Sequence, residues 1–324
     1  MPLLITSLML LVAIAAGLVL GHGSLSDPAL REAFLGLRGV RMACAGLAGA
    51  GLAVAGALMQ GLFRNPLASP SVLGTSAGAA LGGQVVLLLH AHVAASLPLW
   101  LSPELALPLG CLVGAGLSLL ILLLVVERVM RTGGDAMIAV LLTGFLLGSA
   151  FAALGALATW LGQSSWEIGR TLVAFTLGGV DGKSLRHVFL ALPLIVIGIT
   201  AALAWSRHLD VLLSGEEEAA ALGVDISSAR RWILIWTAVL TGAATAIGGG
   251  IAFVGLIVPH VLRRWTGVSH QRLIPACAIG GAAFLIACDT LCRSLPGGEL
   301  PLGVITGLLG VPLFLGLVLR LYRI

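Results

Sequence analysis

Residues 106–126 read ALPLGCLVGAGLSLLILLLVV, and the first charged residues after them are Glu127 and Arg128. An apolar stretch of about 20 residues, folded as a helix, is long enough to cross the hydrocarbon core of a bilayer. Leucine and valine dominate this run, and no charge interrupts it. We therefore predict a membrane-spanning helix over 106–127, and the same pattern recurs along the chain.

The composition extends this prediction to the whole chain. Hydrophobic residues make up 59% of the 324 positions, charged residues make up 10%, and the mean hydropathy is +1.09. Soluble domains contain about 25% charged residues, so the composition excludes a water-soluble fold. Most arginines lie in short breaks between apolar runs, where positive charge orients helices in a membrane. The net charge of +4 is therefore not a sign of nucleic-acid binding.

The apolar runs predict one all-α transmembrane domain over residues 1–324. No Lys or Arg precedes the first run, so we interpret it as a retained span rather than a signal peptide. Gly248, Gly249 and Gly250 precede a short run that Pro259 interrupts, which predicts a broken helix there. The ten expected spans are 3–21, 43–63, 73–91, 106–127, 136–161, 187–206, 230–249, 251–264, 273–293 and 302–321.

An even number of spans places both termini on one side of the membrane. With the termini in the cytoplasm, the cytoplasmic breaks hold eleven arginines and the opposite side holds seven arginines and lysines. The excess favours this orientation. Small residues such as Gly46, Gly49, Gly110 and Gly114 recur at four-residue or similar spacing, which predicts closely approaching helices.

Sequence motifs for nucleotide binding, metal binding or catalysis are weak in this chain. The segment Gly178–Ser184 reads GGVDGKS, but a phosphate-binding loop would need glycine at position 177, which is leucine. His90 and His92 lack a third ligand nearby, and we expect them in a solvated loop. The five cysteines form no metal-binding spacing. We therefore predict no catalytic residue, no metal site and no cofactor in this chain.

Residues 207–231 form the longest polar insert expected on the cytoplasmic side. Glutamates at 216–218, alanines at 219–221 and Gly223 describe a short capped helix. Two interpretations remain open for this insert: a solvated connector, or a docking helix for a cytoplasmic partner with Leu213 and Leu222 beside charged residues.

One acidic residue, Asp289, lies well inside an apolar run, and its neighbours Thr290 and Arg293 could satisfy it. Ionisable residues within a membrane are usually functional. An ion-coupled secondary carrier normally needs more than one such acid, which disfavours that alternative.

Four segments together resemble the FecCD or BtuC-like permease subunits of ABC importers for vitamin B12, haem and ferric siderophores. The resemblance runs from about Arg38 to Arg320. It rests on ALMQGLFRNPLA (57–68) with LGTSAG (73–78), on Gly215-Glu216 through Leu222-Gly223, on IAFVGLIVPH (251–260) with Arg263, and on ELPLGVIT (299–306).

The resemblance implies a type II ABC importer permease fold that works as a homodimer. It implies two cytoplasmic ATPase subunits, which would hold the ATP and Mg2+, and a periplasmic binding protein that delivers the substrate. Family matching assigns ATPase docking to Gly215, Glu216, Glu217, Glu218, Leu222 and Gly223, and binding-protein docking to Arg38, Arg41 and Arg293.

The same matching assigns a cytoplasmic gate to Asn65 and Leu67, and a second gating segment to Thr132–Met137. The expected substrate is a metal chelate, with a ferric siderophore favoured and vitamin B12 or haem as alternatives. The expected location is the bacterial inner membrane.

Overall fold

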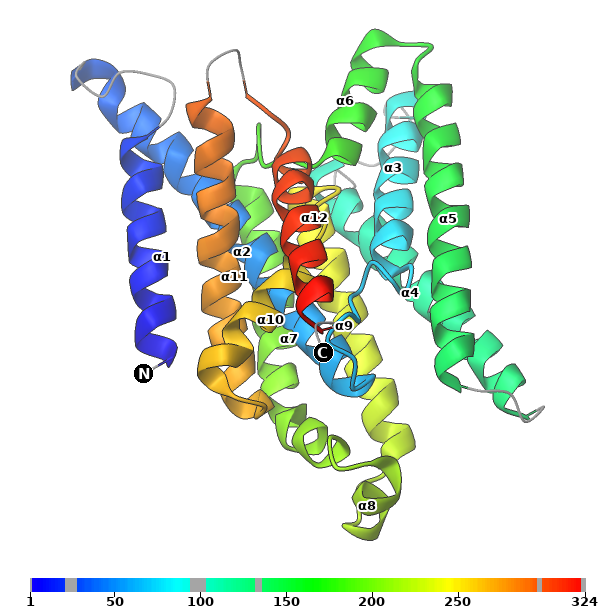
Figure 1. The fold of residues 1–324 in the computed structure, drawn as a ribbon. Helices are drawn as coiled ribbons and strands as arrows, with labels where there is room; N and C mark the ends of the chain where they lie inside the picture. Colours follow the sequence, from blue (N-terminus) through cyan, green and yellow to red (C-terminus); the bar gives the residue numbers. More distant parts are fainter. Residues whose placement is uncertain (1, 21–27, 94–102, 132–135, 296–298, 322–324) are drawn as a thin grey trace.

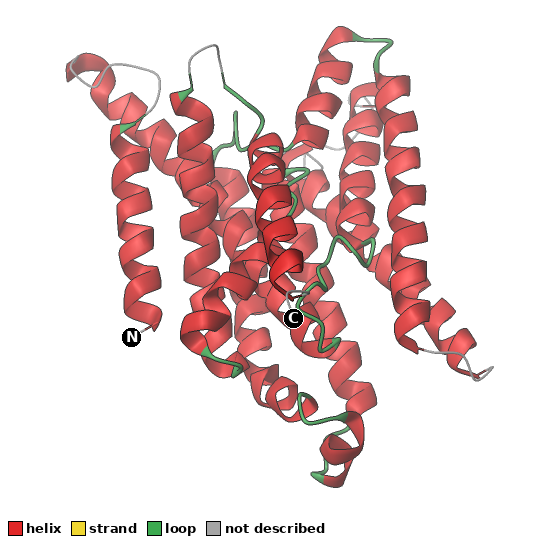
Figure 2. Ribbon diagram, viewed as in Figure 1, coloured by secondary structure: helices red, strands yellow, loops and turns green. Residues whose placement is uncertain are grey.

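The computed structural model describes residues 2–20, 28–93, 103–131, 136–295 and 299–321. Within these ranges the chain consists of helices and their connections, without a strand (Figure 2). The helices are α1 (Pro2–Val19), α2 (Pro28–Leu62), α3 (Thr75–Val93), α4 (Pro103–Arg131), α5 (Ala136–Gly162), α6 (Trp166–Leu177), α7 (Leu185–Leu212), α8 (Glu216–Ala221), α9 (Ile226–Gly248), α10 (Val254–Thr266), α11 (His270–Ser294) and α12 (Leu302–Leu321).

Each of the ten predicted spans coincides with a helix, and α6 and α8 are additional short helices. Seven of the described helices are long and apolar enough to cross a membrane: α1, α2, α4, α5, α7, α9 and α11. The apolar parts of α3 and α12 are shorter, and α10 has 13 residues. The chain is a multi-pass, all-α membrane protein, as its composition predicted.

The bundle is built around α2, α9 and α11. Their apolar windows are 83%, 72% and 67% buried, against 17% for α1 and for α5. The outer helices expose leucine, valine and phenylalanine side chains, as a lipid-facing surface requires. α2 packs on α9 and α11, and α3 packs on α4 (Figure 1).

Two predicted small-residue seams are confirmed. A Cβ on Gly49 of α2 would lie 2.1 Å from the carbonyl oxygen of Gly281 in α11. A Cβ on Gly114 of α4 would lie 2.0 Å from the carbonyl oxygen of Gly78 in α3. Helix backbones therefore touch at these positions, where only glycine fits.

The predicted helix break after α9 is confirmed at the glycine run, but the predicted interruption at Pro259 is wrong. Pro259 lies inside α10, so it does not interrupt the helix. The break occurs at Gly249–Phe253, where Gly249 has φ +66° and Phe253 has φ +65°. A proline inside a helix frees one backbone carbonyl, which neighbouring groups in a membrane bundle can pair with. Pro108, Pro193, Pro275 and Pro312 likewise lie inside helices. α10 is about 20 Å long at 1.5 Å per residue, too short to cross the bilayer straight.

Backbone hydrogen bonds to neighbouring segments pair the polar groups of this irregular stretch. Gly179 N donates to Gly248 O at 2.9 Å, Gly250 N donates to Phe175 O at 3.0 Å, and Leu302 N donates to Gly178 O at 3.0 Å. Non-helical backbone at membrane depth is tolerated where other protein groups pair with it. The GGVDGKS segment is thus the α6–α7 connection, and its backbone also forms hydrogen bonds with the end of α9 and the start of α12.

The two ends of the bundle differ (Figure 1). The end that carries α8 also holds the start of α1 and the end of α12, and we call it the α8 end. The opposite end holds the α5–α6 connection and residues 178–184, and we call it the cavity end. His90 and His92 lie in the last turns of α3, so the prediction of a loop for them is wrong.

Candidate functional site

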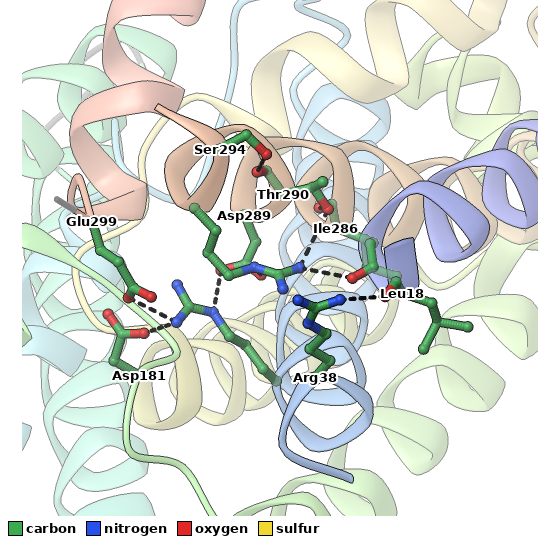
Figure 3. A network of polar contacts seen from close by, with 11 residues as sticks. Leu18, Arg38, Asp181, Ile286, Asp289, Thr290, Ser294 and Glu299 are labelled. Carbon is green, nitrogen blue, oxygen red and sulfur yellow. Dashed lines mark hydrogen bonds and ion pairs between the residues drawn. The ribbon is translucent and has the colours of Figure 1, made fainter. Parts of the chain in front are cut away.

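A network of charged residues lies at the cavity end, centred on Arg41 of α2 (Figure 3). Arg41 Nε donates to Asp289 Oδ1 at 2.8 Å, and Arg41 Nη1 donates to Glu299 Oε2 at 2.8 Å. Arg41 Nη1 also pairs with Asp181. One guanidinium therefore joins α2, α11, the α6–α7 connection and the segment before α12.

Two further arginines complete the network. Arg293 Nε lies 3.1 Å from Asp289 Oδ2, and Arg293 Nη2 donates to Gly17 O at 3.3 Å. Arg38 Nη1 donates to Leu18 O at 2.6 Å. Gly17 and Leu18 are in the last turn of α1, whose carbonyl groups lack helical partners and attract cations. The sequence prediction is confirmed to the extent that Arg293 forms an ion pair with Asp289, although neither Asp289 Oδ2 nor Arg293 Nε makes a hydrogen bond. Thr290 Oγ1 instead donates to Ile286 O.

The three arginines assigned to binding-protein docking therefore lie together, but they are not loop residues. Arg38 and Arg41 were expected before the second span, whereas α2 begins at Pro28 and includes both. Proline at the first helical position and the partners of both arginines stabilise this extension. Arg38 is 5% exposed, Arg293 is 4% exposed, and the Arg41 side chain is 15% exposed. Their docking role stays a prediction.

The two carboxyl groups at the rim of the network, Asp181 and Glu299, have pKa values shifted in opposite directions. Burial raises the pKa of Asp181 to about 6, and its hydrogen bond with Glu299 adds to this rise. Burial opposes the ionisation of Glu299, but hydrogen bonds with Asp181 and Arg41 outweigh it and hold the pKa of Glu299 below its ordinary value. Asp181 is therefore the rim group that gains a proton first as the pH falls.

A cavity of about 910 Å³ adjoins the network. α6 and the α6–α7 connection form most of its wall, and Asp181 and Glu299 belong to both features. Its lining includes the aromatic residues Trp166 and Phe175 and the cations Arg170 and Lys183. Lys183 Nζ also donates to Ala246 O, in the last turn of α9, at 3.5 Å. The cavity could hold a large organic molecule that carries anionic groups.

The sequence prediction missed this cavity because it missed α6. A search for runs of about 20 apolar residues passes over a 12-residue helix. One signal was present: Ser165 followed by Trp166-Glu167 is typical of a helix start.

The predicted gate residues lie at the α8 end, in the α2–α3 connection (residues 63–74). Asn65 Oδ1 accepts a hydrogen bond from Leu67 N at 2.9 Å, and Asn65 N donates to Gln60 O at 3.2 Å. Both side chains are partly buried. The second gating segment starts with residues 132–135, which lie outside the described residues, and both gating roles stay predictions.

The polar insert 207–231 is divided differently from the prediction. α7 continues to Leu212, α8 covers Glu216–Ala221, and α9 begins at Ile226 behind an Asp225 cap. Gly215 and Gly223 flank α8 with φ +128° and +82°. Leu222 is 70% exposed, and Glu217 and Glu218 are exposed beside it. The insert thus presents an apolar residue among acids, as the docking hypothesis requires, and that hypothesis stays untested.

Comparisons with known proteins agree over nearly the whole chain. The model of the FecCD transport family matches residues 3–320. The chain is 37% identical over 276 residues to the cobalamin import system permease protein BtuC of Halobacterium salinarum, covering 85% of this chain and 70% of that protein. It is 36% identical to the hemin transport system permease protein HmuU of Yersinia pestis, covering 91% and 85%. It is also 36% identical to the Fe(3+) dicitrate permease protein FecD of Escherichia coli, covering 87% and 83%.

A solved structure agrees as well. The chain superposes on a metal-chelate type ABC transporter in an inward-facing conformation with a TM-score of 0.83 and 28% identity, covering 100% of this chain and 99% of that one. The matched family model, the relatives and the fold all point to one class: the chain belongs to the FecCD transport family of ABC importer permeases.

Proposed function

We propose that this chain forms the translocation pathway of an ATP-driven importer that carries a ferric siderophore across the bacterial inner membrane by alternating access. The observation that carries the proposal is the pairing of two features at opposite ends of one bundle. A cavity of about 910 Å³ lies at one end, and the exposed α8 segment lies at the other (Figure 1).

The cavity lining favours an iron chelate over cobalamin. Arg170 and Lys183 supply positive charge and Trp166 supplies an aromatic surface. Siderophores with carboxylate or catecholate groups carry the anionic groups that such cations attract. Haem also carries carboxylates and remains the alternative, and vitamin B12 is the second.

The assembly that we propose is a homodimer with two ATPase subunits at the α8 end and a periplasmic binding protein at the cavity end. The α8 end and both termini would then face the cytoplasm. ATP and Mg2+ would bind the ATPase subunits. Closure of the ATPase pair would move α8 and switch the cavity between the two sides.

Transport coupled to an ion gradient fits the geometry poorly. Asp289, the acid inside an apolar run, pairs with both Arg41 and Arg293. A carboxylate held between two arginines is a poor site for a coupled proton or sodium ion, because it must leave both partners to bind the ion.

The proposal is tested with the chain, its ATPase and its binding protein reconstituted in proteoliposomes. Uptake is measured for ⁵⁵Fe-enterobactin (a catecholate), ⁵⁵Fe(III)-dicitrate, ⁵⁵Fe-haemin and ⁵⁷Co-cobalamin, each with and without ATP. We expect ATP-dependent uptake of a siderophore chelate. Uptake of haemin or cobalamin alone would correct the substrate, and uptake driven by an ion gradient without the ATPase would reject the importer class.

A further inference from the structure

A row of four polar side chains crosses the α8 end of the bundle, apart from the network at the cavity end. It begins with Asp210, near the end of α7. Asp210 Oδ1 accepts hydrogen bonds from His270 N at 2.6 Å and from His270 Nδ1 at 2.8 Å. Asp210 Oδ2 accepts from Ser269 Oγ at 2.9 Å. The carboxylate of α7 therefore caps the first turn of α11.

The row continues through two more helices. His270 is fully buried, and its Nε2 lies 3.3 Å from Arg263 Nη2 of α10. Arg263 Nε lies 3.5 Å from Gln60 Oε1 of α2, and Gln60 Nε2 donates to Leu256 O of α10 at 3.2 Å. We call Asp210, His270, Arg263 and Gln60 the coupling row.

The chemistry of these groups fixes the direction of every hydrogen bond. Asp210 accepts three donors, as an ionised carboxylate does, so His270 Nδ1 must carry a proton. Arg263 can only donate, so His270 Nε2 must accept. His270 is therefore a neutral imidazole that donates on one side and accepts on the other. An apolar ring of the same size could do neither.

The two ends of the row lie beside the two features that an importer must connect. α8 packs on α7 and α9, and Asp210 lies in the last turn of α7, just before α8. At the other end, Gln60 O accepts the backbone hydrogen bond from Asn65 N in the α2–α3 connection.

We propose that the coupling row transmits displacement of α8 to the α2–α3 connection, with His270 as the positioning residue at its centre. This inference rests on the proposed function. The row is tight, because a Cβ on Gly61 of α2 would lie 2.4 Å from His270 Nε2. Each contact that breaks leaves a buried polar group without a partner, so the four side chains move together.

The test uses the complete transporter in nanodiscs, with Ser71→Cys as a reporter in the α2–α3 connection. Ser71 is exposed, whereas the five native cysteines are buried. The rate of N-ethylmaleimide labelling is measured with and without ATP and vanadate. We expect nucleotide to change this rate in the parent protein, and His270→Phe to abolish the change while ATP still binds.

Three variants separate hydrogen bonding from packing and charge. His270→Gln keeps one donor and one acceptor and should restore part of the response, which a packing role would not predict. Arg263→Ala should reduce uptake per ATP hydrolysed about 5- to 150-fold, the range that typical coupling energies span. Arg264→Ala removes the same charge from the next, exposed residue and should leave both readouts within about two-fold of the parent.

The outcomes distinguish the two proposals. A parent protein that shows no ATP-driven uptake contradicts the proposed function. The coupling-row proposal is wrong if the parent protein transports but nucleotide does not change the labelling rate of Ser71→Cys. It is also wrong if that change is still seen in His270→Phe. If the His270→Phe complex does not assemble, Gln60→Leu at the other end must abolish the response, and a retained response again rejects the inference.

Discussion

Asp289 shows at the scale of one residue how a charge is kept inside an apolar helix. Its carboxylate is fully buried and lies between Arg41 and Arg293. Removing one member of a buried ion pair leaves its partners uncompensated, at a cost of about 3–5 kcal/mol. The network is therefore sensitive to single substitutions.

Asp289→Ala should lower the thermal unfolding midpoint of the purified protein strongly. The control is Glu127→Ala, which breaks the exposed pair between Glu127 and Arg131 on α4. Exposed pairs at this spacing contribute about 0.3–0.5 kcal/mol, so the control should barely move the midpoint. Equal shifts in the two variants would show that the buried network does not stabilise the fold. The measurement is intrinsic fluorescence during heating in detergent.

Asp181 gives the network a dependence on pH. Its pKa of about 6 lies above the ordinary aspartate value, so its charge is present above pH 6 and is lost as the pH falls through 6. Loss of this charge leaves Arg41 less fully neutralised. If a binding protein offers carboxylates to this face, its affinity should rise about two- to five-fold between pH 7.5 and 5.5, as expected for an exposed charge pair.

Asp181→Asn should remove this part of the pH dependence. The comparison is made with the same binding protein over the same pH range, so titration of the binding protein itself cancels. The measurement is the Kd for the nanodisc-embedded transporter. If the Kd of Asp181→Asn depends on pH as strongly as that of the parent protein, Asp181 does not control docking.

At the scale of elements, the crossing of α6, α9 and α12 depends on backbone groups that pass almost in contact. A Cβ on Gly250 would lie 2.1 Å from Thr176 O. Gly250→Ala should therefore force α6 and α10 apart and lower the unfolding midpoint. Gly116→Ala is the matched control, because nothing lies within 4 Å of its added Cβ. Alanine is about 1 kcal/mol better than glycine in a helix, so the control should hold or raise the midpoint.

The α8 segment presents an apolar side chain that a partner could cover. Leu222→Ser should weaken retention of the ATPase on the purified permease about ten-fold or more, as truncation of an interface anchor does. Val268→Ser is the control, since Val268 is 72% exposed and lies in the α10–α11 connection, outside the insert 207–231. Equal retention in both variants would contradict docking at Leu222. Retention is measured by titrating the ATPase against the immobilised permease.

Glu217→Gln and Glu218→Gln, made together, extend this test to the acidic part of α8. They should reduce uptake more than they reduce ATP hydrolysis, because the polar contacts set the register of docking more than its strength.

At the scale of the whole molecule, the membrane orientation has a direct test. Arg131→Cys lies at the α8 end and Ser164→Cys at the cavity end, and both positions are exposed. An impermeant maleimide added to intact cells without their outer membrane should label Ser164→Cys and leave Arg131→Cys unlabelled. The reverse result would invert the orientation. The five native cysteines are buried and should give little background.

The long helices were predictable because a span needs a simple property, an apolar run of sufficient length. α6 escaped this rule because it has 12 residues. The break after α9 was predictable from the glycine run, but the interruption expected at Pro259 was wrong. Pro108, Pro193, Pro275 and Pro312 also lie inside helices, so proline alone does not locate a break in this bundle.

The partners of Arg41 could not be predicted from local spacing. Asp181, Asp289 and Glu299 are 140, 248 and 258 positions away in sequence. Only the packing of α2 against α11 and the two outer connections brings these side chains together. The intrahelical pair of Asp289 with Arg293 was predictable, because residues four apart share one helix face.

The three arginines and three carboxylates of the network sum to no net charge, so the positive charge that Arg170 and Lys183 add beside it is not cancelled there. A visiting carboxylate would have to exchange places with one that Arg41 already holds. Such an exchange depends on contact geometry rather than on a distant field, so any dependence of the association rate on ionic strength would come from the cations outside the network. Each exchange would also release Asp181 or Glu299, and with it a restraint on the α6–α7 connection or on the segment before α12.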